Sequence, residues 1–259
     1  MKKKEKIDLV ILIIWPILAA VLSLLFKVNA FGSIILFLFL PAVYLSVRGI
    51  KYMKKSLIFS LVVGIPGIII VEYLAHLSDA WLVPFTIFPI RLFGFVTIES
   101  ILWAFFLIYY IIMFYEYFLD KHVAKHLWHP HMKYLAMLVL LGVVVFLVLL
   151  FYSPNVLKIP YFYLCFGILL ILIPIIIELF TYSRLSSKFF KAAAYFFFMT
   201  FIYEVTSLKL GIVAFPGTEF IGWVSILGVS FPFEELFFWC MLFTLAALSY
   251  YEFFDDDEK

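Results

Sequence analysis

Five glutamates lie within or at the ends of long apolar segments of this chain, where a charged side chain is costly. They are Glu72, Glu99, Glu204, Glu234 and Glu235. On the mildest insertion scale, an ionised group at the bilayer centre costs about 2.5–3.5 kcal/mol. Carboxyl groups that crowd together in low dielectric cannot all ionise, so one holds a proton while another can accept one. General acid–base catalysis uses such a pair, and these five residues are the candidate catalytic groups.

The composition predicts that these acids belong to a membrane protein. Among the 259 residues, 66% are hydrophobic and 14% are charged, compared with about 25% charged residues in a soluble domain. Cys165 and Cys240 lie far apart in apolar runs and indicate neither a disulfide nor a metal framework. We therefore expect an all-α fold, a polytopic bundle of membrane-spanning helices.

A window of about 20 residues predicts eight membrane crossings. The apolar stretches are 7–26, 30–47, 56–75, 92–119, 133–153, 161–181, 189–206 and 222–251. If the N-terminus is cytoplasmic, fifteen Lys and Arg residues lie in the inner segments and four in the outer ones. This positive-inside bias predicts a multi-pass protein of the cytoplasmic membrane with both termini in the cytoplasm.

Several features recur along the chain at a spacing of 132 to 136 residues. Glu72 recurs as Glu204, and the segment TIES at 97–100 recurs as PFEE at 232–235. We interpret this recurrence as two tandem halves of four helices each. The halves span residues 1–126 and 127–259. Both halves would enter the membrane from the same side, so a pseudo-twofold axis along the membrane normal would relate them, with a site between them.

The predicted topology brings acids of both halves to a similar depth. Glu72 and Glu204 end the third and seventh crossings on the outer side. Pro232 suits the first turn of a helix, which would place Glu234 and Glu235 in that turn, near the positive end of the helix dipole. Adjacent helical residues point about 100° apart, so only one of the two needs to face a cavity. We expect it to be Glu234, which aligns with the glutamate of TIES, and expect Glu235 to support it.

Aromatic residues surround both motifs and are candidate substrate-binding residues. Those singled out are Trp103, Phe231, Phe237 and Trp239. An apolar, aromatic cavity suits a long polyene, and the faces of such rings stabilise a passing carbocation. The same residue types also fill and anchor membrane helices, so packing remains an alternative for each ring.

A histidine-rich segment offers a second candidate site. His122 and His126 stand one helical turn apart, a spacing that can hold a metal ion. The segment is basic and has only Asp120 nearby as a carboxylate partner. We therefore favour a loop that contacts lipid headgroups, and expect no metal.

The segment EVTSLKLGIVAFPGTEFIGWVSILGVSFPFEELFFW, with Phe-Pro-Gly followed by Pro-x-Glu-Glu, resembles the integral-membrane lycopene cyclase domain. This family includes two-subunit bacterial enzymes, fused archaeal enzymes and fungal fusions with phytoene synthase. The resemblance is best over 200–255 and weaker over 70–120. In the first half Thr97 replaces the proline and Ser100 replaces the second acid, so only Glu99 carries over there.

The resemblance implies a redox-neutral cyclisation of a linear polyene of the lycopene type. A protonated glutamate would protonate C2 of the end group, the resulting cation would close a six-membered ring, and a carboxylate would then remove a proton. This chemistry requires no cofactor and no metal. The implied partners are the apolar polyene, membrane lipids and other enzymes of carotenoid biosynthesis, and not nucleic acid.

Two other function classes fit the same features. A proton-coupled membrane carrier could also use two parallel halves with acids between them. A non-catalytic carotenoid-binding protein would explain why the first motif departs from the family pattern. We favour the cyclase, because few polar residues besides the glutamates would line a transport path.

Overall fold

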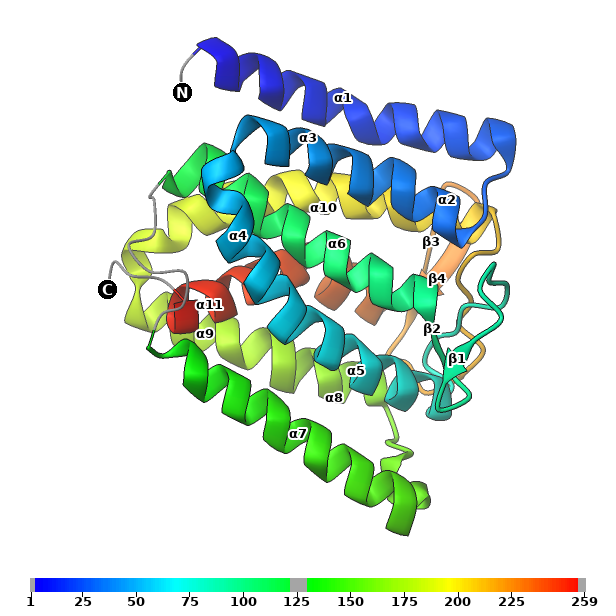
Figure 1. Cartoon of the computed structure of the whole chain (residues 1–259). Coiled ribbons are helices and arrows are strands. Elements are labelled where there is room, and N and C mark those ends of the chain that lie inside the picture. The colour runs from blue at the N-terminus through cyan, green and yellow to red at the C-terminus, as the bar shows by residue number, and fades with distance from the viewer. Residues whose placement is uncertain (1–2, 122–129, 256–259) are drawn as a thin grey trace.

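The computed structural model describes residues 3–121 and 130–255, and within them the chain forms a bundle of eight long helical rods (Figure 1). The rods are α1 (Lys3–Phe26); α2 (Ala30–Ile34), η1 (Ile35–Phe39) and α3 (Leu40–Arg48); α4 (Ile50–Phe59), η2 (Ser60–Gly64) and α5 (Ile65–Leu77); α6 (Ile98–Phe114) and η3 (Tyr115–Asp120); α7 (Met132–Tyr152); α8 (Phe162–Phe166), η5 (Gly167–Leu172) and α9 (Ile173–Thr181); α10 (Ser186–Lys209); and η7 (Glu235–Leu242) and α11 (Phe243–Asp255). The η segments within rods are π-helical, and two short 3-10 turns, η4 (Pro154–Leu157) and η6 (Ser183–Leu185), lie in connections. The expected all-α bundle is confirmed.

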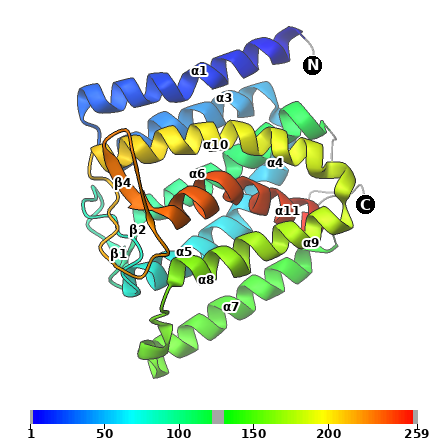
Figure 2. The ribbon, with the colours of Figure 1, turned by 180° about the vertical axis from the view of Figure 1, so that it is seen from behind.

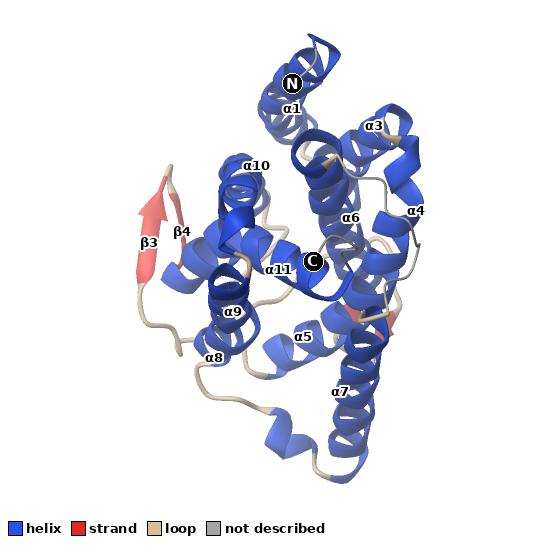
Figure 3. Cartoon of the chain, turned by 90° about the vertical axis from the view of Figure 1, so that its left-hand side faces the viewer, coloured by secondary structure: helices blue, strands red, loops and turns tan. Residues whose placement is uncertain are grey.

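Most of the rods have the length and composition of membrane spans. Among the described residues, seven are long and apolar enough to cross a membrane. The eighth, α10, includes Lys188, Lys191 and Glu204 and packs against α1, η7 and α11 (Figure 2). α1 and α7 lie at opposite edges of the bundle (Figures 1 and 3), where most of their apolar surface is left exposed. The chain is therefore a multi-pass membrane protein.

The helix α6 is the centre of the bundle. It contacts α2, α3, α4, α5, α10 and α11. Every residue from 107 to 116 is buried. This tightly packed stretch separates one end of the bundle, which carries two β-hairpins, from the end near which both termini lie (Figure 1). We call the first of these the hairpin end.

The fourth and eighth rods begin later than the hydrophobic pattern predicts. Residues predicted as the start of each crossing instead form antiparallel hairpins. The hairpin strands are β1 (Arg91–Leu92), β2 (Val96–Thr97), β3 (Trp223–Ile226) and β4 (Val229–Pro232). Leu227 and Gly228 form the two-residue turn of the second hairpin with positive φ angles of 53° and 79°, as a type I′ turn requires. Because alternating strand residues here are apolar, a hydropathy window cannot distinguish them from helix.

The start of each late rod matches its sequence signal. Thr97 caps α6, because its hydroxyl accepts a hydrogen bond from the Ser100 amide at 3.0 Å. Pro232 ends β4, and the last rod starts at the next residue, Phe233. A proline there sacrifices no helical hydrogen bond, since the first amides of a helix have no partner within it. The expected role of Pro232 in setting the start of the helix agrees with this geometry.

Unusual backbone conformations recur along the chain. Left-handed residues occur in pairs, at Lys27 and Tyr161, Asp79 and Gly211, Phe93 and Leu227, and Gly94 and Gly228. The members of each pair lie 132 to 134 residues apart. π-helical segments recur in the same way, because η1 and η5 begin at Ile35 and Gly167. The backbone thus changes direction at matching places, with the spacing at which the sequence motifs recur.

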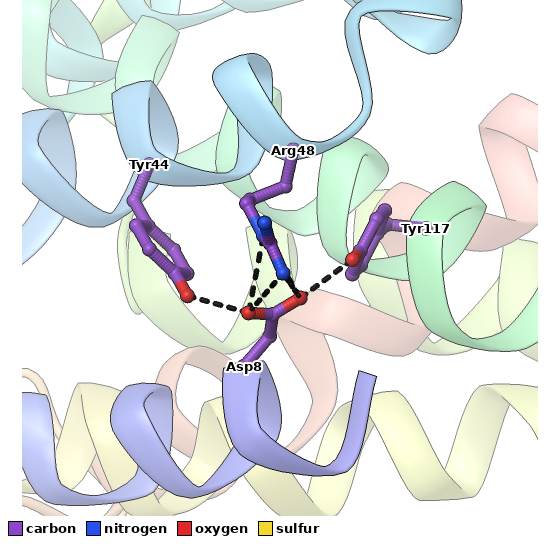
Figure 4. A network of polar contacts seen from close by, with 4 residues as sticks. All are labelled: Asp8, Tyr44, Arg48 and Tyr117. Carbon is purple, nitrogen blue, oxygen red and sulfur yellow. Dashed lines mark hydrogen bonds and ion pairs between the residues drawn. The ribbon is translucent and has the colours of Figure 1, made fainter. Parts of the chain in front are cut away.

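A buried carboxylate fastens α1 to the rest of the bundle. Asp8 accepts hydrogen bonds of 2.6 Å from the hydroxyls of Tyr44 and Tyr117, and the guanidinium of Arg48 donates to both of its oxygens at 3.0–3.1 Å (Figure 4). These partners come from α3 and η3. A charge that is 1% exposed is tolerated here because it is paired and fully hydrogen-bonded.

Candidate active site

The hairpin end of the bundle contains a cavity of about 710 Å³, counting its mouth. Small-molecule sites commonly have volumes of about 300–1,000 Å³. Its walls come from α2, α5, α6, α8, α10 and η7, together with the loops at 78–90 and 210–222. Most of the lining residues are apolar, including Ile34, Ile68 and Val71. A long apolar molecule with few polar groups is the kind of ligand that suits it.

Four of the five predicted acids line this cavity. They are Glu72, Glu99, Glu204 and Glu235. Each of these side chains is at most 5% exposed. The cavity also receives the hydroxyls of Ser100 and Tyr163. Carboxyl groups from four different helical segments therefore meet in one apolar space, as the predicted topology required.

Glu72, near the end of α5, accepts hydrogen bonds at both carboxylate oxygens. Trp81 donates its indole N–H to Oε2 at 2.8 Å, and Ser100 donates its hydroxyl to Oε1 at 2.7 Å. The Ser100 proton is thus used, so the 2.8 Å contact between the hydroxyls of Thr97 and Ser100 is donated by Thr97. Donors at both oxygens stabilise the ionised form of a carboxyl group.

Glu204 and Glu235 form a different arrangement on the opposite wall. Their carboxyl groups are in hydrogen-bonding contact. Since an ionised carboxylate only accepts hydrogen bonds, this contact requires one proton between the two groups. The hydroxyl of Tyr163, near the start of α8, donates a hydrogen bond to Oε2 of Glu235. Oε1 of Glu204 accepts no hydrogen bond from the described residues and is buried in the cavity wall.

The expected orientation of the adjacent glutamates was wrong, because Glu235 faces the cavity and Glu234 does not. Oε1 of Glu234 instead accepts a hydrogen bond from the backbone N–H of Ile221 at 2.7 Å. Glu99 makes the matching contact in the first half, with the N–H groups of Ile87 at 2.6 Å and Phe88 at 3.2 Å. The alignment of Glu99 with Glu234 was useful, but it marks two residues that hold loops.

Two of the four predicted aromatic residues line the cavity. Trp103 and Trp239 do so, with ring centroids 4.7 Å apart and an angle of 29° between the rings. Phe231 and Phe237 are not among its walls, which corrects the prediction for both. Phe231 is buried in β4 before the helix begins, and Phe237 stacks on Phe233 at 5.7 Å.

The two loops that cover the cavity are joined to each other. Leu82 and Ala214 exchange backbone hydrogen bonds of 2.9 and 3.0 Å. Gly217 lies so close to Asp79 that a Cβ atom would stand 2.5 Å from the Asp79 carbonyl oxygen. The absence of a side chain at Gly217 is therefore a requirement of this closure.

Sequence reasoning did not find Trp81 and Tyr163. Trp81 lies in a loop with no motif, and Tyr163 lies in a segment that was recognised only as hydrophobic. Ser100 was noted as a departure from a motif, with no role. The signal for all three is contact with a buried glutamate, which requires the fold.

The other predicted site was the histidine segment. His122 and His126 lie outside the described residues. Among the residues that the structure does describe, no three His, Cys, Asp or Glu side chains are grouped so that they could hold a metal ion. Comparison of the chain with protein-family models, with curated proteins and with solved structures found no match.

Proposed function

We propose that this chain is a membrane-embedded carotenoid end-group cyclase that acts on a linear polyene such as lycopene. The observation that carries this proposal is the apolar cavity in which Glu72, Glu99, Glu204 and Glu235 meet beside the stacked rings of two tryptophans. Protonation of an unactivated double bond needs a carboxylic acid, a base and protection from water. The cavity offers all three in one place.

The reaction is an isomerisation. A proton added to C2 of the end group uses the C1=C2 electron pair and leaves a tertiary cation at C1. The C5=C6 pair then forms the C1–C6 bond and moves the cation to C5. Loss of a proton from a neighbouring carbon forms the ring double bond. The product has the same atoms and electrons as the substrate, so no oxidant or reductant takes part.

The tryptophan pair supports this chemistry. Trp103 and Trp239 lie one helical turn deeper than Glu99 and Glu235 and share the cavity wall with them. The face of an indole ring attracts a positive charge, by about 0.5–2 kcal/mol depending on how much water is excluded. A cation that forms near the carboxyl groups would be stabilised there.

We also propose that the chain consists of two tandem halves, as the recurring motifs suggest. The recurring left-handed residues support this organisation. Two contacts join corresponding positions, because Leu82 bonds to Ala214 and Trp103 stacks on Trp239. Contacts between equivalent residues are expected where a pseudo-twofold axis passes. The active site would then lie at the junction of the halves, in the cytoplasmic membrane, with both termini in the cytoplasm.

The packing of α6 favours an enzyme over a carrier. Residues 107–116 are buried without interruption below the cavity. They include large side chains such as Tyr110 and Tyr115, neither of which has measurable exposure. A transported ion or solute would have to cross this packed stretch to reach the other end of the bundle.

Expression of the chain in a lycopene-accumulating bacterium, with analysis of the pigments, tests the proposed function. We expect monocyclic or bicyclic carotenoids from the wild type and none from Glu235→Gln. A matched control is Glu219→Gln, because Glu219 is exposed and accepts only a backbone N–H from Tyr161 among the printed contacts. Unchanged lycopene at good expression of the wild type would refute this substrate. A wild-type yield from Glu235→Gln would refute the role of that residue.

A further inference from the structure

We propose that the two walls of the cavity have opposite roles, the Glu204–Glu235 pair with Tyr163 supplying the proton and Glu72 with Trp81 and Ser100 receiving it. The chemical step of this proposal rests on the proposed function. The protonation pattern does not, because it follows from the hydrogen bonds in the cavity.

The key difference between the walls is the residue that faces each glutamate of a third helix. Ser100 faces Glu72, and Glu235 faces Glu204, at corresponding positions of the two motifs. A hydroxyl can donate to a carboxylate, and here it does. A second carboxyl group can make the same contact only if a proton is shared. Replacing one acid by serine therefore changes a proton-holding pair into a single ionised carboxylate.

Further donors strengthen the contrast. Trp81 donates to the second oxygen of Glu72 and has no acceptor function in its indole N–H, so it can only stabilise negative charge there. On the other wall, the Tyr163 hydroxyl binds Oε2 of Glu235. This single donor fixes the orientation of Glu235, while Oε1 of Glu204 remains directed to the cavity wall without a donor among the described residues.

The two walls are close enough to act on one end group. The rings of Trp81 and Tyr163 are in contact, with centroids 5.1 Å apart. The residue that holds the base thus touches the residue that holds the acid. A polyene end lying between them would have the proton donor on one side and the acceptor on the other, as separate protonation and deprotonation sites require.

The step balances with these assignments. The Glu204–Glu235 pair gives its proton to C2 and becomes a pair of carboxylates, and Glu72 takes the proton released by the cyclised cation. Return of that proton from Glu72 to the pair restores the enzyme. Tyr163 and Trp81 are positioning residues in this scheme, since they act through the carboxyl groups that they bind.

Deuterium exchange separates the two roles. In D2O, the wild type should place one deuterium in each ring that it forms. With Glu72→Gln we expect at least a tenfold loss of product, while recovered lycopene gains deuterium at C2, because protonation still occurs and reverses. With Glu235→Gln we expect neither product nor exchange. Exchange with Glu235→Gln and none with Glu72→Gln would overturn the assignment.

Infrared difference spectroscopy tests the protonation pattern without any substrate. The wild type should show the C=O stretching band of a buried protonated carboxyl group. We expect Glu235→Gln to lose this band and Glu72→Gln to keep it; the reverse result, or no such band in the wild type, would overturn the proposal. If the spectra agree but lycopene is never cyclised, the proposed function fails while the divided site stands.

Tyr163→Phe provides a test that a purely structural role would not pass. Loss of its hydrogen bond should shift the carboxyl band and lower the cyclisation rate roughly tenfold, the size of one hydrogen bond to an acidic group. The control is Tyr250→Phe, because the Tyr250 hydroxyl bonds only to the Leu170 carbonyl among the printed contacts, at 3.3 Å and away from the cavity. An unshifted band in Tyr163→Phe, with a normal rate, would remove Tyr163 from the scheme.

Discussion

Trp103 and Trp239 stack against each other in the wall of the cavity, with their ring centroids 4.7 Å apart. Each follows a cavity-lining glutamate, Glu99 or Glu235, by four residues, which is about one helical turn. The stack therefore presents aromatic surface directly below the carboxyl groups. It joins α6 to the last rod at the same time, so its loss would affect both the lining and the packing.

Replacement of either tryptophan should slow cyclisation more than it impairs folding. If the indole stabilises a cation by about 0.5–2 kcal/mol, Trp239→Leu should lower the rate by roughly 2- to 30-fold. Trp239→Phe retains an aromatic face and should lose less. The measurement is initial product formation at equal protein levels. Equal rates for the leucine and phenylalanine variants would contradict a role for the aromatic face.

Glu234 and Glu235 should respond differently to the same substitution. Glu234→Gln keeps an oxygen that can accept the hydrogen bond from Ile221, so we expect most of the activity to remain. Glu234→Ala leaves that N–H without its partner and should destabilise the loop by about 1–3 kcal/mol. Pigment yield and thermal stability of both variants check this. Complete inactivity of a well-folded Glu234→Gln protein would show that its carboxyl group takes part in the chemistry.

Asp8→Asn should loosen α1 from the bundle. The neutral amide cannot accept all the donors that surround Asp8, and it leaves Arg48 without its counter-charge. We expect a loss of about 1.5–3 kcal/mol in stability, the value of hydrogen bonds to charged groups. Thermal denaturation in detergent measures the loss.

The exposed ion pair of Lys158 with Asp79 is the control for Asp8→Asn. Its nitrogen and oxygen lie 3.3 Å apart, and both side chains are more than half exposed. Lys158→Ala should change stability by less than about 1 kcal/mol. If the two variants were equally stable, the Asp8 network would not be the anchor of α1.

Two glycines in helical segments make a matched pair for a packing test. A Cβ atom at Gly167 would lie 2.3 Å from the ring of Phe238, whereas one at Gly142 would meet no atom within 4 Å. Gly167→Ala should therefore cost about 1–3 kcal/mol through overpacking. Gly142→Ala should be neutral or stabilise α7 by up to about 1 kcal/mol. The same thermal assay compares them, and a stabilising Gly167→Ala would show that this contact yields easily.

Much of the fold could be predicted from the sequence, because membrane helices leave a strong hydrophobic signal. The eight rods lie where the apolar stretches are, and the errors fall at 91–97 and 223–232, where apolar strand residues imitate helix. The meeting of the acids followed from topology alone. The side chain that faces the cavity did not, since a one-residue shift turns a helix by about 100°. Only the observed start of the last rod directs Glu235, and not Glu234, inwards.

The partners of the acids were beyond sequence reasoning for a different reason. Trp81 and Tyr163 reach Glu72 and Glu235 from a loop and from a distant helix, and neither distance along the chain nor residue type indicates such a contact. Ser100 appeared as an imperfection in a motif. Its meaning depends on what it touches.

Ser100 also bears on the direction in which a proton can travel. Two identical walls would exchange protons across the cavity with no preference, and a bound hydrocarbon could be protonated or deprotonated from either side. With a hydroxyl beside Glu72 and a carboxyl group beside Glu204, the two sides no longer mirror each other. A duplicated architecture has in this way acquired a polarity, and one serine is enough to set it.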